Sequence, residues 1–186
     1  MSTVPSQWTR TEWTGPRLLI ASWGVLGVVG ILFQALYRLT PLALEPVQRD
    51  LLAPYQWFIY VGWAVLNLYA EGYKGFQRGF NPRVIARAIH LAHHPRALHV
   101  LLAPAFCMSL FHATKKRLIV SWTLVGGLTL IVLLVRQLPQ PWRGIVDIGV
   151  VTGLGYGAIH LVVAFFTTLV AREFPTTDSL PERATT

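Results

Sequence analysis

The chain has 186 residues, of which 53% are hydrophobic and only 13% charged, and its formal net charge is +8. A soluble domain carries about 25% charged residues, so this composition excludes an ordinary soluble fold and predicts one domain built from membrane spans. The excess of Lys and Arg flanks apolar runs, which indicates membrane topology and anionic lipid rather than nucleic acid. The single cysteine, Cys107, excludes an intrachain disulfide.

Four apolar runs are long enough for a membrane-spanning helix, and we expect spans at about 18–39, 55–72, 118–135 and 144–170. At 1.5 Å per residue, about 20 residues cross a ~30 Å hydrocarbon core. The first run lies between Arg17 and Arg38 with no small-residue cleavage site behind it, so it is expected to remain as an anchor. The predicted fold is an all-α integral membrane protein, with a cytoplasmic segment 1–17, a polytopic membrane domain 18–172 and a flexible tail 173–186.

A fifth apolar run, 97–113, is shorter and contains Pro104, which interrupts helical hydrogen bonding. No acidic residue lies between Glu71 and Asp147, so the distribution of cations decides where this run lies. If it stays on one side, twelve Lys and Arg lie inside and four outside; if it crosses, the numbers are nine and seven. Cationic loops stay in the cytoplasm. This favours four spans with both termini inside and a short re-entrant or in-plane apolar helix at 97–113, with five spans as the alternative.

The basic cytoplasmic loop 73–117 contains a predicted amphipathic helix. Asn81 and Pro82 suit its first positions, and Pro95 ends it at His94. We expect this helix to lie in the membrane interface and bind anionic lipid or a partner, with more charge once its histidines protonate below about pH 6.5. A solvated basic face packed on neighbouring loops is the alternative. The candidate binding residues are Lys74, Arg78, Arg83, Arg87, His90 and His94.

The last span carries a stripe of small residues. Gly149, Gly153 and Gly157 recur every four residues and form two overlapping G-x-x-x-G units, whereas Gly155 points away from them. Small residues at this spacing let the backbone of another helix approach closely. We expect the partner helix to belong to the same chain, with another subunit as the alternative.

Polar residues inside spans are costly in lipid and are therefore candidates for function. His160 lies near the middle of the last span, and a neutral ring bonded to a neighbouring helix is the expected arrangement. No cofactor is expected. Imidazole also suits Fe, Cu and Zn, so a haem or a single metal held by His160 with His99 or His112 is the alternative.

The function that the sequence favours is that of a small polytopic membrane protein, a non-enzymatic accessory, assembly or scaffold subunit. Its expected partners are anionic lipids and another membrane protein or a second copy of the chain, without nucleic acid. Two alternatives are a membrane redox or haem protein, and a small transporter or channel lined by His160, Asn67 and Glu71. Small size, a lone cysteine and the bias of cations predict a bacterial inner membrane.

Overall fold

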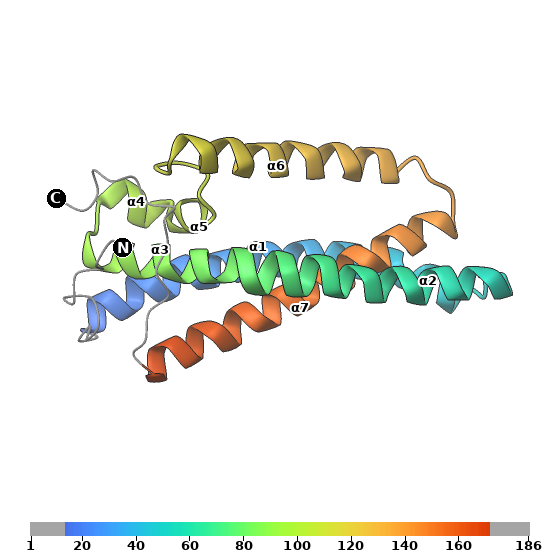
Figure 1. Cartoon of the computed structure of the whole chain (residues 1–186), viewed down its shortest axis with the longest axis horizontal. Helices are drawn as coiled ribbons and strands as arrows, with labels where there is room; N and C mark the ends of the chain where they lie inside the picture. Colours follow the sequence, from blue (N-terminus) through green and yellow to red (C-terminus); the bar gives the residue numbers. More distant parts are fainter. Residues whose placement is uncertain (1–13, 172–186) are drawn as a thin grey trace, which may run out of the picture.

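The structure is a computed structural model that describes residues 14–171, and this part of the chain is helical and contains no strand. The helices are α1 (Gly15–Gln48), α2 (Pro54–Asn67), the π-helix η2 (Leu68–Phe80), α3 (Asn81–His93), α4 (Ala97–Leu101), α5 (Ala103–Cys107), α6 (Lys115–Val135) and α7 (Trp142–Ala171). Helices α1 and α2 pack along α7 and α6 runs apart from them, and the start of α1 and the end of α7 lie at the same end (Figure 1). The all-α prediction is confirmed over these residues.

Within residues 14–171, three helices are long and apolar enough to cross a membrane, namely α1 with 34 residues, α6 with 21 and α7 with 30. These helices fall in three of the four regions where the sequence predicts spans, 18–39, 118–135 and 144–170. The expected second span differs from them, because its α-helical part, α2, has only 14 residues before the backbone widens into η2.

Helices α2, η2 and α3 together form one continuous rod, here called the second rod, which does not end where the sequence predicts. Helices α2, η2 and α3 follow one another without a break from 54 to 93, and Phe80 and Asn81 both have right-handed helical backbone. The expected helix from Asn81 to His94 is present as α3, but it continues η2 directly and most of its residues are buried, so it is not a separate amphipathic helix outside the bundle. Asn81 does not cap a helix; its amide side chain is buried and hydrogen-bonds α7. The predicted end before Pro95 agrees with the structure, where α3 stops at His93.

The face of the second rod that contacts α7 changes its spacing along the rod. In α2 the contacting residues are four apart, Trp63 and Asn67, and from Glu71 onward they are five apart, Glu71, Phe76 and Asn81. A π-helix has a wider turn than an α-helix because its hydrogen bonds reach one residue further. The wider turn of η2 therefore keeps residues five apart on the same side, so the contact with α7 continues along the whole rod.

The three glycines of the last span lie in this contact. A Cβ atom at Gly149 would meet Trp63, and one at Gly157 would collide with the ring of Phe76. The missing Cβ atoms leave the room that these large side chains occupy, so the partner of this glycine stripe lies within the same chain.

Helix α1 packs on α3 and α5 through a second close approach. A Cβ at Gly24 would lie 2.9 Å from the sulfur of Cys107 and 3.6 Å from Ala88, and one at Gly27 would meet the ring of Pro104. The largest apolar cluster of the described residues is centred here, and Val25, Val84 and Phe106 are among its buried members. The 97–113 run thus forms the short helices α4 and α5 rather than a single crossing helix.

The contacts between the second rod and α1 determine which parts of the two helices lie side by side. The hydroxyl of Tyr60 in α2 donates to Ala43 O near the end of α1, at 3.0 Å, whereas Ala88 of α3 lies beside Gly24 near its start. The cationic helix α3 consequently lies beside the apolar first half of α1, and not outside the bundle as its charge pattern suggests.

Helix α6 differs from the other long helices because none of its residues is buried. It starts beside α5 and runs parallel to the bundle before the chain turns into α7 (Figure 1). Its apolar side chains point in every direction around the helix, as in a helix surrounded by lipid.

Replacing Gly153 with Leu tests the close contact between α7 and the second rod. A Cβ there would lie 3.0 Å from the Cβ of Glu71 and 3.2 Å from Asn67 O, so we expect a loss of about 1–3 kcal/mol from overpacking, measured by thermal unfolding in mild detergent. Gly155→Leu is the matched control, because a Cβ there would meet the flexible end of Leu36 at an ordinary distance of 3.8 Å. Equal losses in the two variants would contradict a packing role for the glycine stripe.

Candidate functional site

The six basic positions expected to form one lipid-facing surface have different environments. Lys74, Arg78 and His94 are exposed, Arg83 and His90 are half-buried, and Arg87 is fully buried. The ammonium of Lys74 lies over the ring of Tyr69, and the guanidinium of Arg78 lies over the ring of Tyr73. The expectation that Arg87 faces lipid headgroups is wrong, because α1 covers one side of α3 while α5 and the turn after it cover the other.

The guanidinium of Arg87 connects α3 to the turn between α5 and α6. Its Nε donates to Phe106 O at 2.7 Å, and Nη2 donates to Phe111 O at 3.1 Å and His112 O at 3.0 Å. It also lies 4.2 Å above the centroid of the Phe106 ring. A planar guanidinium has five donors in a fixed fork, which suits several carbonyls that converge on one point.

The turn that Arg87 holds has an unusual backbone. Ser109 and His112 have φ angles of 61° and 50°, in the left-handed region that residues with a side chain rarely adopt. Carbonyl groups in such a turn cannot form regular helical hydrogen bonds, and Arg87 supplies donors to two of them. Burial lowers the pKa of Arg87 to about 10, so the side chain remains charged at neutral pH.

Four histidines gather around this turn in two pairs, of which His90 with His94 is stacked and His99 with His112 is tilted. The rings of His90 and His94 are 4.8 Å apart, and those of His99 and His112 are 4.9 Å apart. Burial, followed by the nearby His94 and Arg87, lowers the pKa of His90 to about 4. The expected gain of charge below pH 6.5 is therefore wrong for His90, which stays neutral until the solution is considerably more acidic.

His160 lies in the contact between α7 and the second rod. The side-chain amide nitrogen of Asn81 lies 3.0 Å from both Gly157 O and His160 Nδ1. Since a carbonyl accepts only from a donor, the nitrogen of Asn81 faces Gly157 O and its second hydrogen points to His160 Nδ1. This arrangement assigns His160 a neutral ring with its proton on Nε2, bonded to a neighbouring helix.

The three histidines considered for a metal or haem do not form one site. His99 and His112 lie together beside α5, whereas His160 lies on α7 and is hydrogen-bonded to Asn81 of α3. Among residues 14–171, no group of three or more His, Cys, Asp or Glu side chains has the proximity that a metal ion needs. The thiol of Cys107 is buried against Gly24, and burial raises its pKa to about 12.

The sequence pattern predicted other roles for Asn81 and Arg87 than those that the structure shows. Asn81 resembles a helix cap because it precedes proline, and Arg87 resembles an exposed cation because it shares a face with other basic residues. The sequence did contain a signal for Arg87, since small and aliphatic residues, Ile85, Ala86 and Ala88, surround it. Small neighbours allow helices to pack closely on both sides of an arginine.

Substituting Arg87 tests its role in holding the turn. In Arg87→Gln the carbonyls of Phe106, Phe111 and His112 lose their shared donor while they remain covered, so we expect a loss of about 3 kcal/mol, measured as a lower thermal midpoint in detergent. Arg96→Gln is the matched control because Arg96 is exposed at the same end of the bundle. A loss no larger than that of the control would show that the turn forms without Arg87.

The described part of the chain thus contains a buried cation, Arg87, that holds a turn through three carbonyls, and polar side-chain pairs between helices that include Asn81 with His160 and Tyr156 with Gln77. Comparison of the whole sequence and structure with protein-family models, curated proteins and solved structures finds no match.

Proposed function

We propose that the chain is a four-span bacterial inner-membrane protein that acts as a non-enzymatic accessory, assembly or scaffold subunit. In this proposal the second rod crosses through its apolar 55–72 segment, and both termini lie in the cytoplasm. The return direction of the second rod beside α1 supports four crossings, as does the way α6 and α7 run back and forth along the bundle (Figure 1).

The positions of the cations support this orientation. Lys115, Lys116 and Arg117 begin α6 at the end of the bundle where Arg17 begins α1, whereas Arg136 and Arg143 flank the opposite turn between α6 and α7. Cationic clusters next to spans stay on the cytoplasmic side. The end that contains α4, α5 and the start of α6 is therefore assigned to the cytoplasm.

The observation that carries a scaffold role is the exposure of α6. None of its residues is buried, although its hydropathy is the highest of the three spanning helices. The middle of this helix contains small residues with open space around them, since a Cβ at Gly126 or Gly127 would meet no atom within 4 Å. Thr123 precedes Gly127 by four residues, a spacing at which a second membrane helix can approach closely. The outer face of α6 is therefore proposed to bind a partner membrane protein.

Labelling a cysteine introduced at Thr114 tests the four-span topology. Thr114 immediately precedes α6 and is partly exposed, whereas the native Cys107 is buried and should not react. A membrane-impermeant maleimide applied to intact cells should fail to label Thr114→Cys and should label it after the membrane is opened. Labelling of intact cells would place this turn outside and contradict the proposed orientation.

Replacing Gly127 with Leu tests the docking role of α6. Because nothing in the described part of the chain lies near this position, the substitution should leave folding unchanged and obstruct a partner helix. We expect the complex that is extracted from native membranes in mild detergent to fall to the mass of a single chain, measured by light scattering after gel filtration. Gly30→Leu, which also meets no atom within 4 Å but lies on α1, should leave the complex intact. A wild-type protein that is already a single chain, or loss in both variants, would overturn the proposal.

A further inference from the structure

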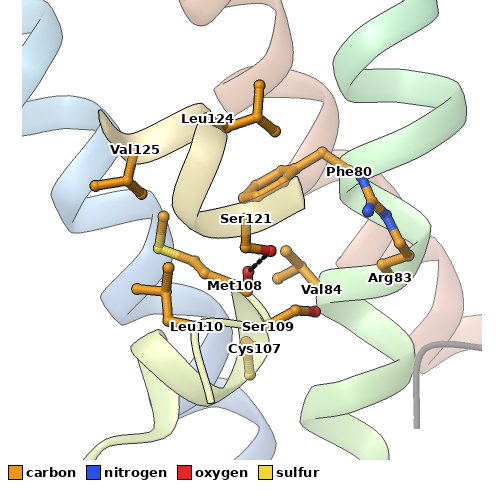
Figure 2. A pocket seen from close by; sticks show the side chains of 10 residues that line it. All are labelled: Phe80, Arg83, Val84, Cys107, Met108, Ser109, Leu110, Ser121, Leu124 and Val125. Carbon is orange, nitrogen blue, oxygen red and sulfur yellow. Dashed lines mark hydrogen bonds between the residues drawn. The ribbon is translucent and has the colours of Figure 1, made fainter. Parts of the chain in front are cut away.

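A small cleft lies between the first half of α6 and the neighbouring part of the bundle. Helix α6 contacts the bundle near its start, where Ser121 donates to Met108 O at 3.4 Å and the indole of Trp122 donates to Leu110 O at 3.1 Å. Next to these bonds a space remains between α6, α3 and the turn after α5 (Figure 2). The walls are mainly apolar and include Phe80, Val84, Met108, Leu124 and Val125.

The cationic side chain of Arg83 lines this cleft, and Arg117 lies next to it. The guanidinium of Arg83 lies beside Phe80 on the α3 side of the cleft. Leu124 and Val125 of α6 line the opposite side (Figure 2). Its Nε donates to Gly79 O one turn earlier, which uses one of five donors and leaves the others for a bound group. Arg117 lies four residues before Ser121, which lines the cleft, so it falls on the same face of α6 at the edge of the cleft. Burial, followed by the proximity of Arg117, lowers the pKa of Arg83.

These two cations have no carboxylate near them in sequence, because no acidic residue lies between Glu71 and Asp147. The acidic side chains of the described residues, Glu45, Asp50, Glu71 and Asp147, all belong to other parts of the fold, on α1, the turn after it, η2 and α7. Two arginines at the edge of an apolar cleft therefore favour an anionic group whose remaining part is apolar.

We propose that this cleft binds one anionic phospholipid, with its phosphate on Arg83 and Arg117 and an acyl chain between α6 and the wall formed by α3 and Met108. Arginine matches phosphate geometry through paired N–H donors. Within a bilayer, an apolar cleft that no helix fills is filled by hydrocarbon chains. The site uses the inner face of α6, so it is compatible with a protein partner on the outer face.

The inference rests on the part of the proposed function that places α6 across the membrane, and it does not depend on partner binding. It also differs from general attraction of a basic surface to anionic lipid, since it requires one lipid at one place. Removal of a cation elsewhere on the protein should have no effect on this bound lipid.

Native mass spectrometry of the full chain, delipidated in detergent and then mixed with lipid, tests the site. Phosphatidylglycerol should remain bound as one molecule per chain, and phosphatidylcholine with the same acyl chains should bind much more weakly. Arg83→Gln and Arg117→Gln should each weaken phosphatidylglycerol binding about fivefold, the equivalent of roughly 1 kcal/mol for each cation near the phosphate. Arg136→Gln, at the far end of α6, should bind as wild type does.

Two further measurements distinguish a lipid in the cleft from a free phosphate ester bound by the same arginines. Leu124→Trp, which enlarges a side chain in the cleft wall, should reduce binding of the lipid without removing a charge. Water-soluble glycerol 3-phosphate should not compete; competition would identify a site for free phosphate esters and overturn the lipid assignment. Equal binding of the two lipids, or equal loss in Arg136→Gln and Arg83→Gln, would overturn it as well.

The docking variant separates the two proposals. Gly127→Leu should lose its protein partner and keep its lipid, because Gly127 does not line the cleft. A chain that is labelled from outside at Thr114→Cys yet still binds one phosphatidylglycerol would overturn the proposed orientation and leave the lipid site standing.

Discussion

The close contact of α7 with the second rod determines where most other parts of the molecule lie. Lipid supplies no hydrophobic drive between helices, so association depends on close packing and on hydrogen bonds between them. At Gly149, Gly153 and Gly157 the missing Cβ atoms let Trp63, Glu71 and Phe76 reach the backbone of α7. The π-helix η2 maintains that contact, because its wider turn keeps residues five apart on one face. The same geometry brings Asn81 to Gly157 O and His160, and it places α3 beside the first half of α1.

In that position the buried charge of Arg87 on α3 needs compensating contacts, because its surroundings are apolar. Arg87 is fully buried, and removing a charge from water costs several kcal/mol unless hydrogen bonds and electrostatic contacts compensate for it. Three carbonyl groups and the face of Phe106 supply those contacts. The arginine in turn stabilises a turn with left-handed residues, which lies directly before α6. The charge thus serves the packing of α3, α5 and the start of α6 together.

The position of α6 follows from this turn and gives the helix two different faces. The inner face meets the bundle through Ser121 and Trp122 and borders the cleft that Arg83 also lines. The outer face has no neighbour in the described part of the chain and contains small residues at helix-docking spacing. An anionic lipid in the cleft would support α6 from inside, and the outer face would remain open to a partner. In this arrangement, binding lipid and presenting a docking helix are related tasks of one subunit.

The sequence alone determined the all-α membrane class, the three long apolar helices and the end of α3 before Pro95, because these depend on composition, length and local backbone chemistry. It also indicated the glycine stripe, since a four-residue period is visible without knowledge of the partner. Only the tertiary structure decided that the second rod is continuous, that Asn81 bonds α7 rather than capping a helix, and that Arg87 is buried. The reason is that the sequence alone does not distinguish a cation or a polar amide that faces water from one that faces a neighbouring carbonyl. Which of the two they meet depends on helices distant in the chain, here α5 for Arg87 and α7 for Asn81.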